Sequence, residues 1–471
     1  MSLPSGAARA LLAAAFALPC AAMTSAAQSQ RRTCDIEVQN TPDTRLSSYT
    51  LPTGNRNTFW GGGVHAICRR ERMNIRADSA EYYGDEKRLF LVGHVVYDEP
   101  RIHLTSDYLT YFGIDERVVA SSNVNVRLPN GSTMVGPQAE YQRKYALRPQ
   151  SLLNAIGRPT ITLKEREAPG AKPEPPTTVL ATTVVVVADS LIHDIGQVEI
   201  TRPDLIARGD SAFIDSGTEF MSLARQPSIE GKREKPYRLA GTLIDLHSRR
   251  RKLLRAHARG AATATNEDMT LTSDTIDMRV ADDLLQEVFA WGKGRARAKS
   301  PTQDIIADSI RVDMPAQRVR EVHALRSARA EAMPDTVRLH TRERDWLEGD
   351  TVVALFDTTA VATGDTTRRA QIRRLRAAGD ARSYYHLASA DTSAREPAIN
   401  YVRGRIITVN FDSARVATVA VQGRSTGLYL EPSRADTTAS TTRATPANRP
   451  PAGGRPAPAT QVLPMRPRGR P

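Results

Sequence analysis

Apolar and polar residues alternate in short segments from Gly63 to Leu128, and turns separate the segments. Met73–Tyr82, Arg88–Tyr97 and Arg101–Tyr111 all show this two-residue period. Alternation over four to eight residues is typical of strands that are buried on one face. The pattern repeats along the chain, and a repeat of this length indicates stacked units, none of which can bury its apolar face alone. We therefore predict an all-β fold of stacked antiparallel strands.

A small residue followed by Asp recurs between the alternating segments. The Asp residues of this motif are Asp78, Asp107, Asp189, Asp210, Asp274, Asp308 and Asp350. An Asp at a tight bend or bulge can accept hydrogen bonds from nearby backbone N–H groups. We interpret these residues as structural, and we expect one bend in the sheet at each of them.

Changes in composition divide the chain into six parts. The first residues resemble a cleaved signal peptide. Arg9 gives a basic start, and the apolar run Ala10–Ala22 that follows is too short to span a bilayer. Small residues precede the expected cleavage site at Gln28. Segments rich in Pro and polar residues are typical of linkers and disordered tails. The predicted parts are a signal peptide (1–27), an irregular N-terminal segment (28–57), a first β array (58–163), a Pro-rich linker or exposed loop (164–178), a second β array (179–432) and a disordered basic tail (433–471).

Two of the three cysteines remain after the predicted cleavage. Cys20 leaves with the signal peptide, whereas Cys34 and Cys68 stay in the exported chain. An even number of cysteines in an oxidising compartment favours a disulfide. We predict a Cys34–Cys68 disulfide, and two unpaired thiols are the alternative.

The chain carries a formal net charge of +13, but the excess is unevenly placed. The tail after Ser433 holds seven arginines and a single Asp. Elsewhere basic and acidic residues are interspersed, whereas a nucleic-acid interface requires a continuous basic stripe with aromatic stacking platforms. We therefore predict no nucleic-acid partner, and the basic balance favours an anionic lipid or membrane surface.

Motifs for catalysis and metal binding are missing from the sequence. The nine histidines are scattered, without the spacing of a zinc site, and there is no nucleophile elbow, phosphate loop or dinucleotide fingerprint. We predict a protein that is not an enzyme and that uses neither a cofactor nor a metal. Because carboxylates are plentiful, a polysaccharide-acting enzyme with a carboxylate pair remains a further alternative.

The alternation places a set of apolar side chains on one face of the predicted strands. These residues are Met73, Ile75, Leu89, Leu91, Val95, Tyr97, Ile102, Leu104, Val124 and Val126. They would form a continuous apolar strip, which has two interpretations. An open or rolled sheet could hold a lipid in this strip, at roughly 0.8 kcal/mol for each buried CH₂. A filled interior, as in an ordinary sandwich, is the other interpretation.

Four short segments resemble the OstA-like (organic solvent tolerance-like) family. They are Ala77-Asp78-Ser79, Gly93-His94-Val95-Val96-Tyr97, Ile102-His103-Leu104-Thr105-Ser106-Asp107 and Ser122-Asn123-Val124. This family includes periplasmic lipopolysaccharide-transport proteins and the N-terminal domain of the outer-membrane lipopolysaccharide-assembly protein. The resemblance is clear over 58–163 and weaker towards Pro432. It implies a β-jellyroll of V-shaped strands that binds the lipid A part of lipopolysaccharide and assembles end to end.

These observations lead to one functional hypothesis and one main alternative. We expect a periplasmic lipid-binding protein, exported and associated with the outer membrane, which carries or bridges lipopolysaccharide or a similar envelope lipid. The ten residues of the apolar strip would hold the acyl chains. The resemblance implies that other lipopolysaccharide-transport components and further copies of the chain are partners. The alternative is a structural, β-solenoid-like scaffold of the envelope that has a packed interior and no lipid ligand.

Overall fold

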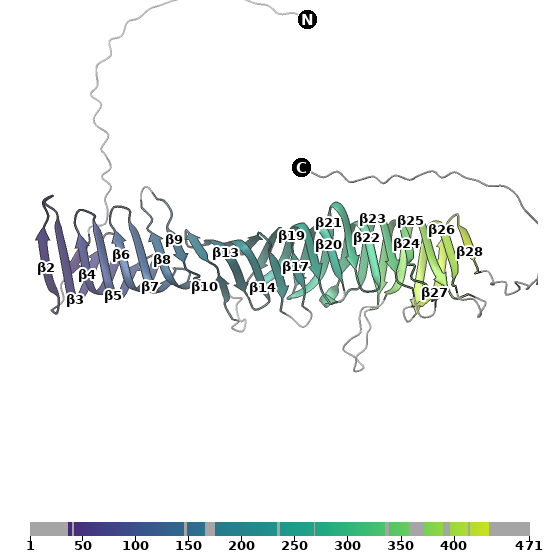
Figure 1. Ribbon diagram of the computed structural model, residues 1–471, viewed down its shortest axis with the longest axis horizontal. Helices are drawn as coiled ribbons and strands as arrows, with labels where there is room; N and C mark the ends of the chain where they lie inside the picture. Colours follow the sequence, from purple (N-terminus) through teal and green to yellow (C-terminus); the bar gives the residue numbers. More distant parts are fainter. Residues whose placement is uncertain are drawn as a thin grey trace, which may run out of the picture.

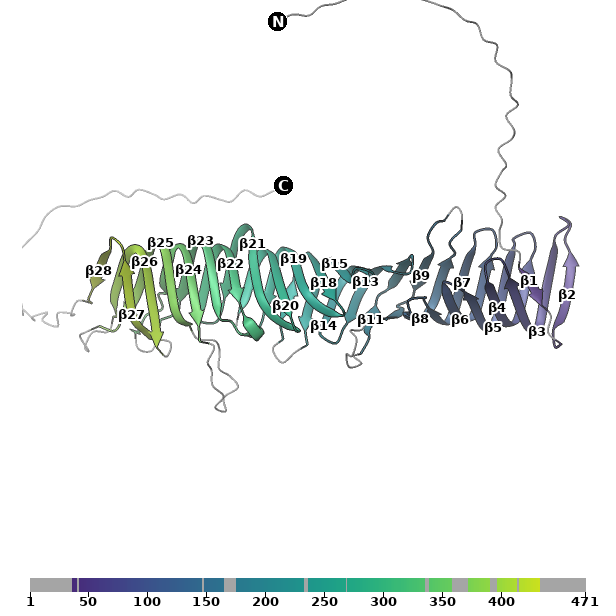
Figure 2. The ribbon, with the colours of Figure 1, turned by 180° about the vertical axis from the view of Figure 1, so that it is seen from behind.

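The computed structural model describes residues 36–39, 42–145, 148–164, 175–232, 236–267, 269–334, 339–357, 372–389, 396–412 and 415–432. These residues form twenty-eight strands in one continuous antiparallel sheet, together with a 3-10 helix at Pro315–Gln317. Figures 1 and 2 show the strands side by side along one long axis, with β2 near one end and β28 near the other. The prediction of an all-β fold of stacked antiparallel strands is confirmed.

The strands have the following bounds. The first fourteen are β1 (Glu37–Gln39), β2 (Arg45–Thr50), β3 (Arg56–Cys68), β4 (Met73–Tyr83), β5 (Arg88–Glu99), β6 (Ile102–Phe112), β7 (Arg117–Arg127), β8 (Thr133–Gln142), β9 (Leu152–Ile156), β10 (Thr160–Leu163), β11 (Thr177–Leu180), β12 (Thr183–Val187), β13 (Leu191–Thr201) and β14 (Leu205–Asp215). The others are β15 (Phe220–Ala224), β16 (Ser228–Gly231), β17 (Arg238–Ala240), β18 (Leu243–Arg249), β19 (Lys252–Thr265), β20 (Thr270–Ala281), β21 (Leu284–Lys299), β22 (Gln303–Asp313), β23 (Glu321–Ala332), β24 (Asp345–Phe356), β25 (Ile372–Leu387), β26 (Ala398–Asp412), β27 (Arg415–Gln422) and β28 (Thr426–Leu430).

Each long strand is interrupted near its middle by a bulge. The pairing of β3 with β4, for example, stops at Gly61 and Ser79 and resumes at Val64 and Ala77. Equivalent register shifts follow in successive strand pairs, including β4–β5, β5–β6, β6–β7 and β7–β8. A bulge bends the strand that carries it. Because the bulges lie beside one another, the whole sheet bends along one line.

The bend divides the sheet into two arms, which we call arm A and arm B. Arm A contains the turns between Glu99 and Ile102 and between Arg127 and Thr133. Arm B contains the turns between Tyr83 and Arg88 and between Phe112 and Arg117. Buried and more exposed residues alternate along both arms, and the buried side chains form one hydrophobic cluster. The core of the protein therefore lies between the inner faces of the arms.

Six of the seven Asp residues of the repeated motif lie at the bend, as predicted. The prediction is wrong for Asp189, which lies in the turn between β12 and β13 at the end of arm B. The carboxylate of Asp274 accepts hydrogen bonds from the backbone N–H groups of Lys293 at 2.5 Å and Gly294 at 2.8 Å. Asp107 accepts hydrogen bonds from Ser122 and Asn123, both at 2.6 Å. The structural interpretation is confirmed for these two residues, because the carboxylates pair with the bulge of the neighbouring strand.

Gly93 shows why the bend requires a small residue. Its φ is +79°, in the region that favours glycine, and a Cβ atom there would lie 2.2 Å from Oδ2 of Asp78. The following residue, His94, also has a positive φ, and its Nδ1 lies 2.8 Å from the same carboxylate oxygen. The small-Asp sequence in one strand, β4, and the Gly-x sequence in the next, β5, thus form one structural unit.

The prediction that residues 28–57 are irregular is wrong for two segments. β1 and β2 both pair with β3 and extend the sheet at its N-terminal end. All six residues of β2 are exposed. A strand at the end of the array does not need one apolar face, so β2 lacks the alternation by which the other strands were predicted.

The sheet also continues through the expected linker at 164–178. β10 and β11 pair from Thr160–Leu180 to Leu163–Thr177, so this segment joins two neighbouring strands. Residues 165–174 lie outside the described residues.

The strand pairing changes on both sides of this segment. β8 pairs with both β9 and β10, and β13 pairs with both β11 and β12. Since β9 also pairs with β12, these six strands form a closed ring, which we call the six-strand ring.

Cys68 forms a disulfide. The pairing of β1 with β3 places Glu37 opposite Ile67, next to Cys68. The predicted partner, Cys34, lies outside the described residues.

We expect thiol labelling of the unfolded, unreduced mature chain to find no free thiol. A Cys68→Ala variant is expected to expose one free thiol. In the chain-entropy description such a loop stabilises the fold by about 3–4 kcal/mol. Two free thiols per wild-type chain would contradict the prediction.

The predicted signal peptide (1–27) and the predicted tail (433–471) also lie outside the described residues. Among the residues that the structure describes, no helix is long and apolar enough to cross a membrane.

Candidate functional site

The ten residues of the predicted apolar strip lie together on the inner faces of the arms. Each of them exposes 2% of its surface or less, and all belong to the single hydrophobic cluster. The alternation thus predicted correctly which side chains face inward and which of them are neighbours. In the structure these side chains fill the space between the arms.

The free ends of the two arms meet along an edge that we call the seam. Glu99 ends β5 on arm A, whereas Glu116 and Arg143 lie beyond the ends of β6 and β8 on arm B. Nε of Arg143 lies 2.5 Å from Glu99, and its Nη1 lies 2.6 Å from Glu116. The three side chains expose 8% of their surface or less. One buried guanidinium therefore joins two buried carboxylates and connects the arms.

Three tyrosines complete this group, which we call the Arg143 cluster (Glu99, Glu116, Arg143, Tyr97, Tyr111 and Tyr141). Tyr141 and Tyr97 donate hydrogen bonds to Glu99, and Tyr111 donates one to Glu116 at 2.9 Å. Burial raises the pKa of all three hydroxyl groups well above the usual tyrosine range. The hydroxyls therefore stay protonated and donate hydrogen bonds at physiological pH. The cluster covers the apolar interior with a network in which every charge has a partner.

Further polar contacts cross the seam next to the Arg143 cluster. Arg101 on arm A lies 2.7 Å from the carboxylate of Asp189 on arm B, and Asn130 on arm A donates to the backbone carbonyl of Asp189 at 3.0 Å. Farther along, Arg202 on arm A donates to Ser248 Oγ on arm B at 2.8 Å. Ion pairs and hydrogen bonds therefore hold the arms together from the Arg143 cluster to Arg202.

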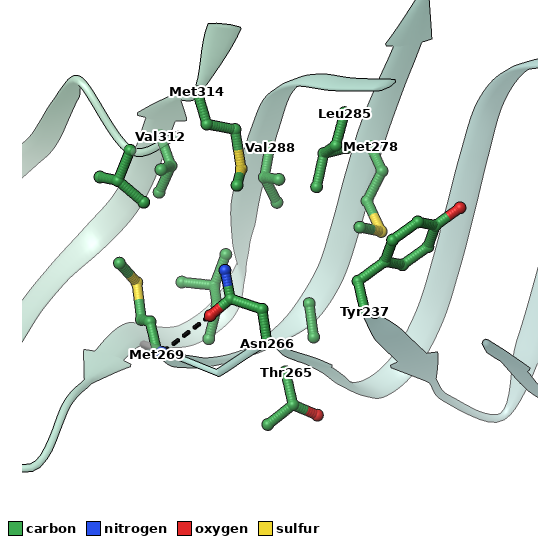
Figure 3. A pocket seen from close by; sticks show the side chains of 12 residues that line it. Tyr237, Thr265, Asn266, Met269, Met278, Leu285, Val288, Val312 and Met314 are labelled. Carbon is green, nitrogen blue, oxygen red and sulfur yellow. Dashed lines mark hydrogen bonds between the residues drawn. The ribbon is translucent and has the colours of Figure 1, made fainter. Parts of the chain in front are cut away.

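Beyond these contacts the seam has an apolar opening, which we call the mouth. It encloses a volume of about 40 Å³ between the end of arm A and the strands of arm B. Figure 3 shows Met269 and Asn266 on one side, facing Met314, Val288 and Leu285 on the other. The residues that line the mouth are Tyr237, Ala264, Thr265, Asn266, Met269 and Leu271 from arm A, and Met278, Leu285, Val288, Val312, Met314 and Val319 from arm B.

The size and composition of the mouth define what it can do. A volume of 40 Å³ has room for only a few water molecules, so the arms must separate before an acyl chain can enter. Three of the lining residues are methionines, whose unbranched side chains adapt to different neighbours. The mouth is therefore a deformable apolar point of access to the core.

Basic side chains flank the mouth on arm B. Arg318 and Arg320 are both exposed and lie on either side of Val319, which lines the mouth. The turn Arg249–Lys252 also ends on arm B, and its Lys252 Nζ lies 2.6 Å from Asp283 in the neighbouring turn. An apolar opening beside exposed arginines can accept an amphiphile that has an anionic head group.

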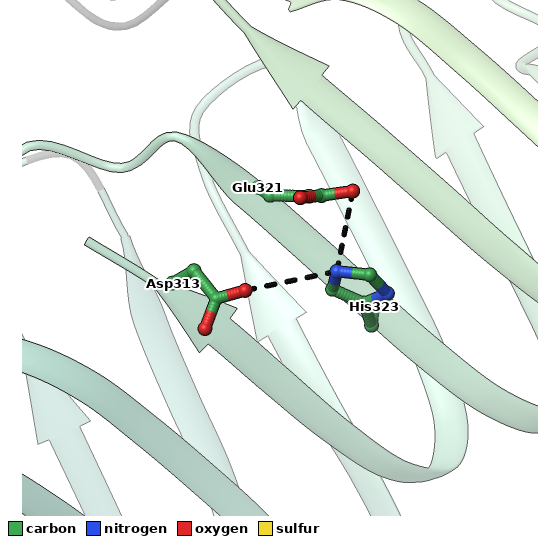
Figure 4. Close-up of side chains that lie close together, drawn as sticks. All are labelled: Asp313, Glu321 and His323. Atoms are coloured by element: carbon green, nitrogen blue, oxygen red, sulfur yellow. Dashed lines mark ion pairs between the residues drawn. The ribbon is translucent and has the colours of Figure 1, made fainter. Parts of the chain in front are cut away.

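One group of three residues on the outer surface could offer ligands to a metal ion (Figure 4). Nε2 of His323 lies 3.7 Å from Asp313 and 3.2 Å from Glu321, and all three side chains are half-buried. Arg311 lies 3.1 Å from the other oxygen of Asp313 and so already neutralises part of its charge. We interpret the group as a cross-strand ion-pair network, of the kind that joins neighbouring strands in antiparallel sheets.

The sequence patterns did not identify the seam. Arg143 is 44 residues from Glu99 and 27 residues from Glu116, and no short motif connects them. A comparison with known protein families finds no match, and a comparison with curated proteins finds none either.

Proposed function

We propose that this protein binds an envelope lipid and holds its acyl chains between the two arms. The ligand would be lipopolysaccharide or a similar lipid, carried or bridged through the periplasm towards the outer membrane. The mouth is the observation that carries this proposal, because it is an apolar opening of the seam directly onto the core. The resemblance over 58–163 to the OstA-like family favours the same function.

The energetics of entry are consistent with this proposal. Each methylene group that leaves water for an apolar interior contributes about 0.8 kcal/mol. Ten such groups would contribute about 8 kcal/mol, which can offset the partial loss of contacts between the arms. Among the described residues, the arms are joined at the seam through side chains and not by backbone pairing, so they can separate without breaking the sheet.

The charges around the mouth support an anionic ligand. Arg318 and Arg320 would contact phosphate or carboxylate groups while the acyl chains pass Val319 into the core. Arginine binds such groups through two parallel hydrogen bonds, which orients the head group as well as attracting it.

Both ends of the array are suited to partners. Leu46 and Tyr49 on β2 are about half exposed, as are Leu428, Tyr429 and Leu430 at the other end. Terminal strands have unpaired backbone groups that can add a further strand. We propose that the ends join other copies of the chain or other components of lipopolysaccharide transport.

The second candidate function is a structural scaffold of the envelope. The observation that favours it is the nearly complete burial of the ten strip residues, which leaves the interior filled. A filled interior suits a rigid spacer as well as it suits a lipid carrier in its empty state.

Photo-crosslinking distinguishes these two functions. A crosslinking residue at Met314, in the mouth, is expected to label acyl chains in the native envelope. The matched control is Leu254, an apolar residue on β19 that is 43% exposed and does not line the mouth. Lipid adducts from position 314 but not from position 254 would support lipid binding. Lack of adducts from positions 314, 269 and 91, together with no lipid in the purified protein by mass spectrometry, would favour the scaffold.

A further inference from the structure

One acidic side chain lies inside the apolar core with no partner. Asp194 is on β13, and 1% of its surface is exposed. Neither carboxylate oxygen has a hydrogen-bond partner among the described residues. The residues opposite it in the sheet are Val184 on β12 and Ala212 on β14. Burial of an unpaired polar group costs several kcal/mol unless its charge is neutralised.

The repeats of the chain show what normally occupies this position. Asp194 lies two residues before Gly196, which has a positive φ at the bend. Leu91 holds the same place before Gly93, and alanines hold it before the positive-φ residues of other strands. These alanines are Ala120, Ala258, Ala324 and Ala377, and each is fully buried, as is Leu91. Asp194 therefore takes the place of an apolar core residue.

Within the described part of the chain, no charged side chain compensates Asp194. The inward-facing residues on its own and neighbouring strands are Ala155, Val184, Val186, Ile192, Ala212 and Ile214, and none of them titrates. On the same two strands, the ion pair of Arg208 with Glu199 at 3.1 Å lies on the outer face of the sheet, beyond the bend. Burial alone raises the pKa of Asp194 to about 7.

Asp194 also lies at a weak section of the sheet. β13 belongs to the six-strand ring, in which β9 and β12 have five residues each and β10 and β11 have four. Strands β5, β6 and β7 have eleven or twelve residues. β9 and β10 lie end to end along β8, and β11 and β12 lie end to end along β13. β13 has five paired positions with β12 and three with β11, whereas β5 and β6 share ten. Because there are fewer paired positions and the split strands are interrupted at the bend, this section is expected to open more readily than the section of β5 and β6.

We propose that Asp194 is a proton-binding site that controls the opening of the six-strand ring. When the carboxyl group is protonated it can remain in the apolar interior, and the ring stays closed. When it ionises, the carboxylate favours an open ring in which water reaches it. Because the ring lies between the Arg143 cluster and the mouth, its state determines whether the interior is continuous between them. The proposal concerns the sheet itself and does not depend on lipid binding.

The direction of the pH effect follows from linkage. The closed ring binds the proton more tightly than an open ring does, because the pKa is raised on burial. The closed state is therefore most favoured at acidic pH, and it loses stability as the pH rises to about 7. The equilibrium constant for opening should increase roughly tenfold per pH unit between about pH 5 and pH 7, and it should then level off.

Hydrogen exchange of the full mature chain, followed by mass spectrometry, tests this proposal. The measured quantity is the protection of peptides from β12 and β13 relative to peptides from β5 and β6 at the same pH, which removes the intrinsic pH dependence of exchange. In the wild type this ratio should fall at least tenfold from pH 5 to pH 7. In Asp194→Ala, which has the residue of the equivalent positions, the ratio should not change with pH.

A matched control removes a carboxylate that is exposed. Asp210 lies at the bend of the neighbouring strand β14 and is exposed, so Asp210→Ala should keep the fall seen in the wild type. A wild-type ratio that does not change between pH 5 and pH 8 would overturn the proposal. The same fall in Asp194→Ala as in the wild type would overturn it as well, because another group would then be responsible.

Discussion

Replacing Arg143 with Met is expected to lower the free energy of unfolding by about 3–5 kcal/mol. Methionine retains much of the apolar stem, so the packing loss is small, but it leaves Glu99 and Glu116 without the cation that joins them. Removal of one member of a buried ion network leaves uncompensated charge inside the protein. Urea denaturation at pH 7 measures the effect, and the loss should shrink towards pH 5 because unpaired buried carboxylates take up protons.

Two further variants make this prediction specific. Arg117 is also on arm B, but its contacts with Glu140 and Asp115 are 3.9 and 4.0 Å long and partly exposed. Arg117→Met should therefore change stability by less than about 1 kcal/mol. Adding Glu99→Gln and Glu116→Gln to Arg143→Met should restore much of the loss. If Arg143→Met were as stable as the wild type, the two arms would not depend on the Arg143 cluster.

The second large effect is expected from Leu91→Asp. Leu91 is fully buried, and Asp194 shows that the array can hold a carboxyl group at the equivalent position. We expect the variant to fold at pH 5 and to lose stability as the pH rises, at a rate of up to roughly 1.4 kcal/mol per pH unit. The reason is again that the protonated form can stay in the core, whereas the ionised form cannot.

Leu91→Ala is the control for this measurement, because alanine occupies the equivalent position in several other strands. It removes the same packing without adding a carboxyl group, at a cost of about 2–5 kcal/mol that should not depend on pH. Urea denaturation of both variants at pH 5, 6, 7 and 8 isolates the effect of the charge. If both variants lost the same stability at every pH, a carboxylate at position 91 would reach water. That result would indicate an open groove, and it would favour lipid binding over a filled scaffold.

The alternation of apolar and polar residues was sufficient to predict the strands and the inward-facing side chains. Leu89 and Leu91 illustrate this, since each was assigned to the inner face and each is buried there. The motif at Asp107 was also interpretable, because an Asp at a bulge bonds with groups only one strand away. These features depend on neighbours in the chain or in the next strand, and such neighbours leave a regular pattern in the sequence.

Tertiary structure alone decided which residues meet across the seam. Arg143 reaches Glu99 because the bulges bend the sheet enough to bring the ends of the arms together. The mouth, for the same reason, combines Tyr237 with Val319, which are far apart in sequence. The alternation did not reveal β2, because an exposed end strand needs no apolar face. It did not reveal the burial of Asp194 either, because a polar residue at an inward-facing position interrupts the apolar pattern. Local periodicity determines which face of a strand is buried, but the angle and position of the bend determine what lies opposite that face.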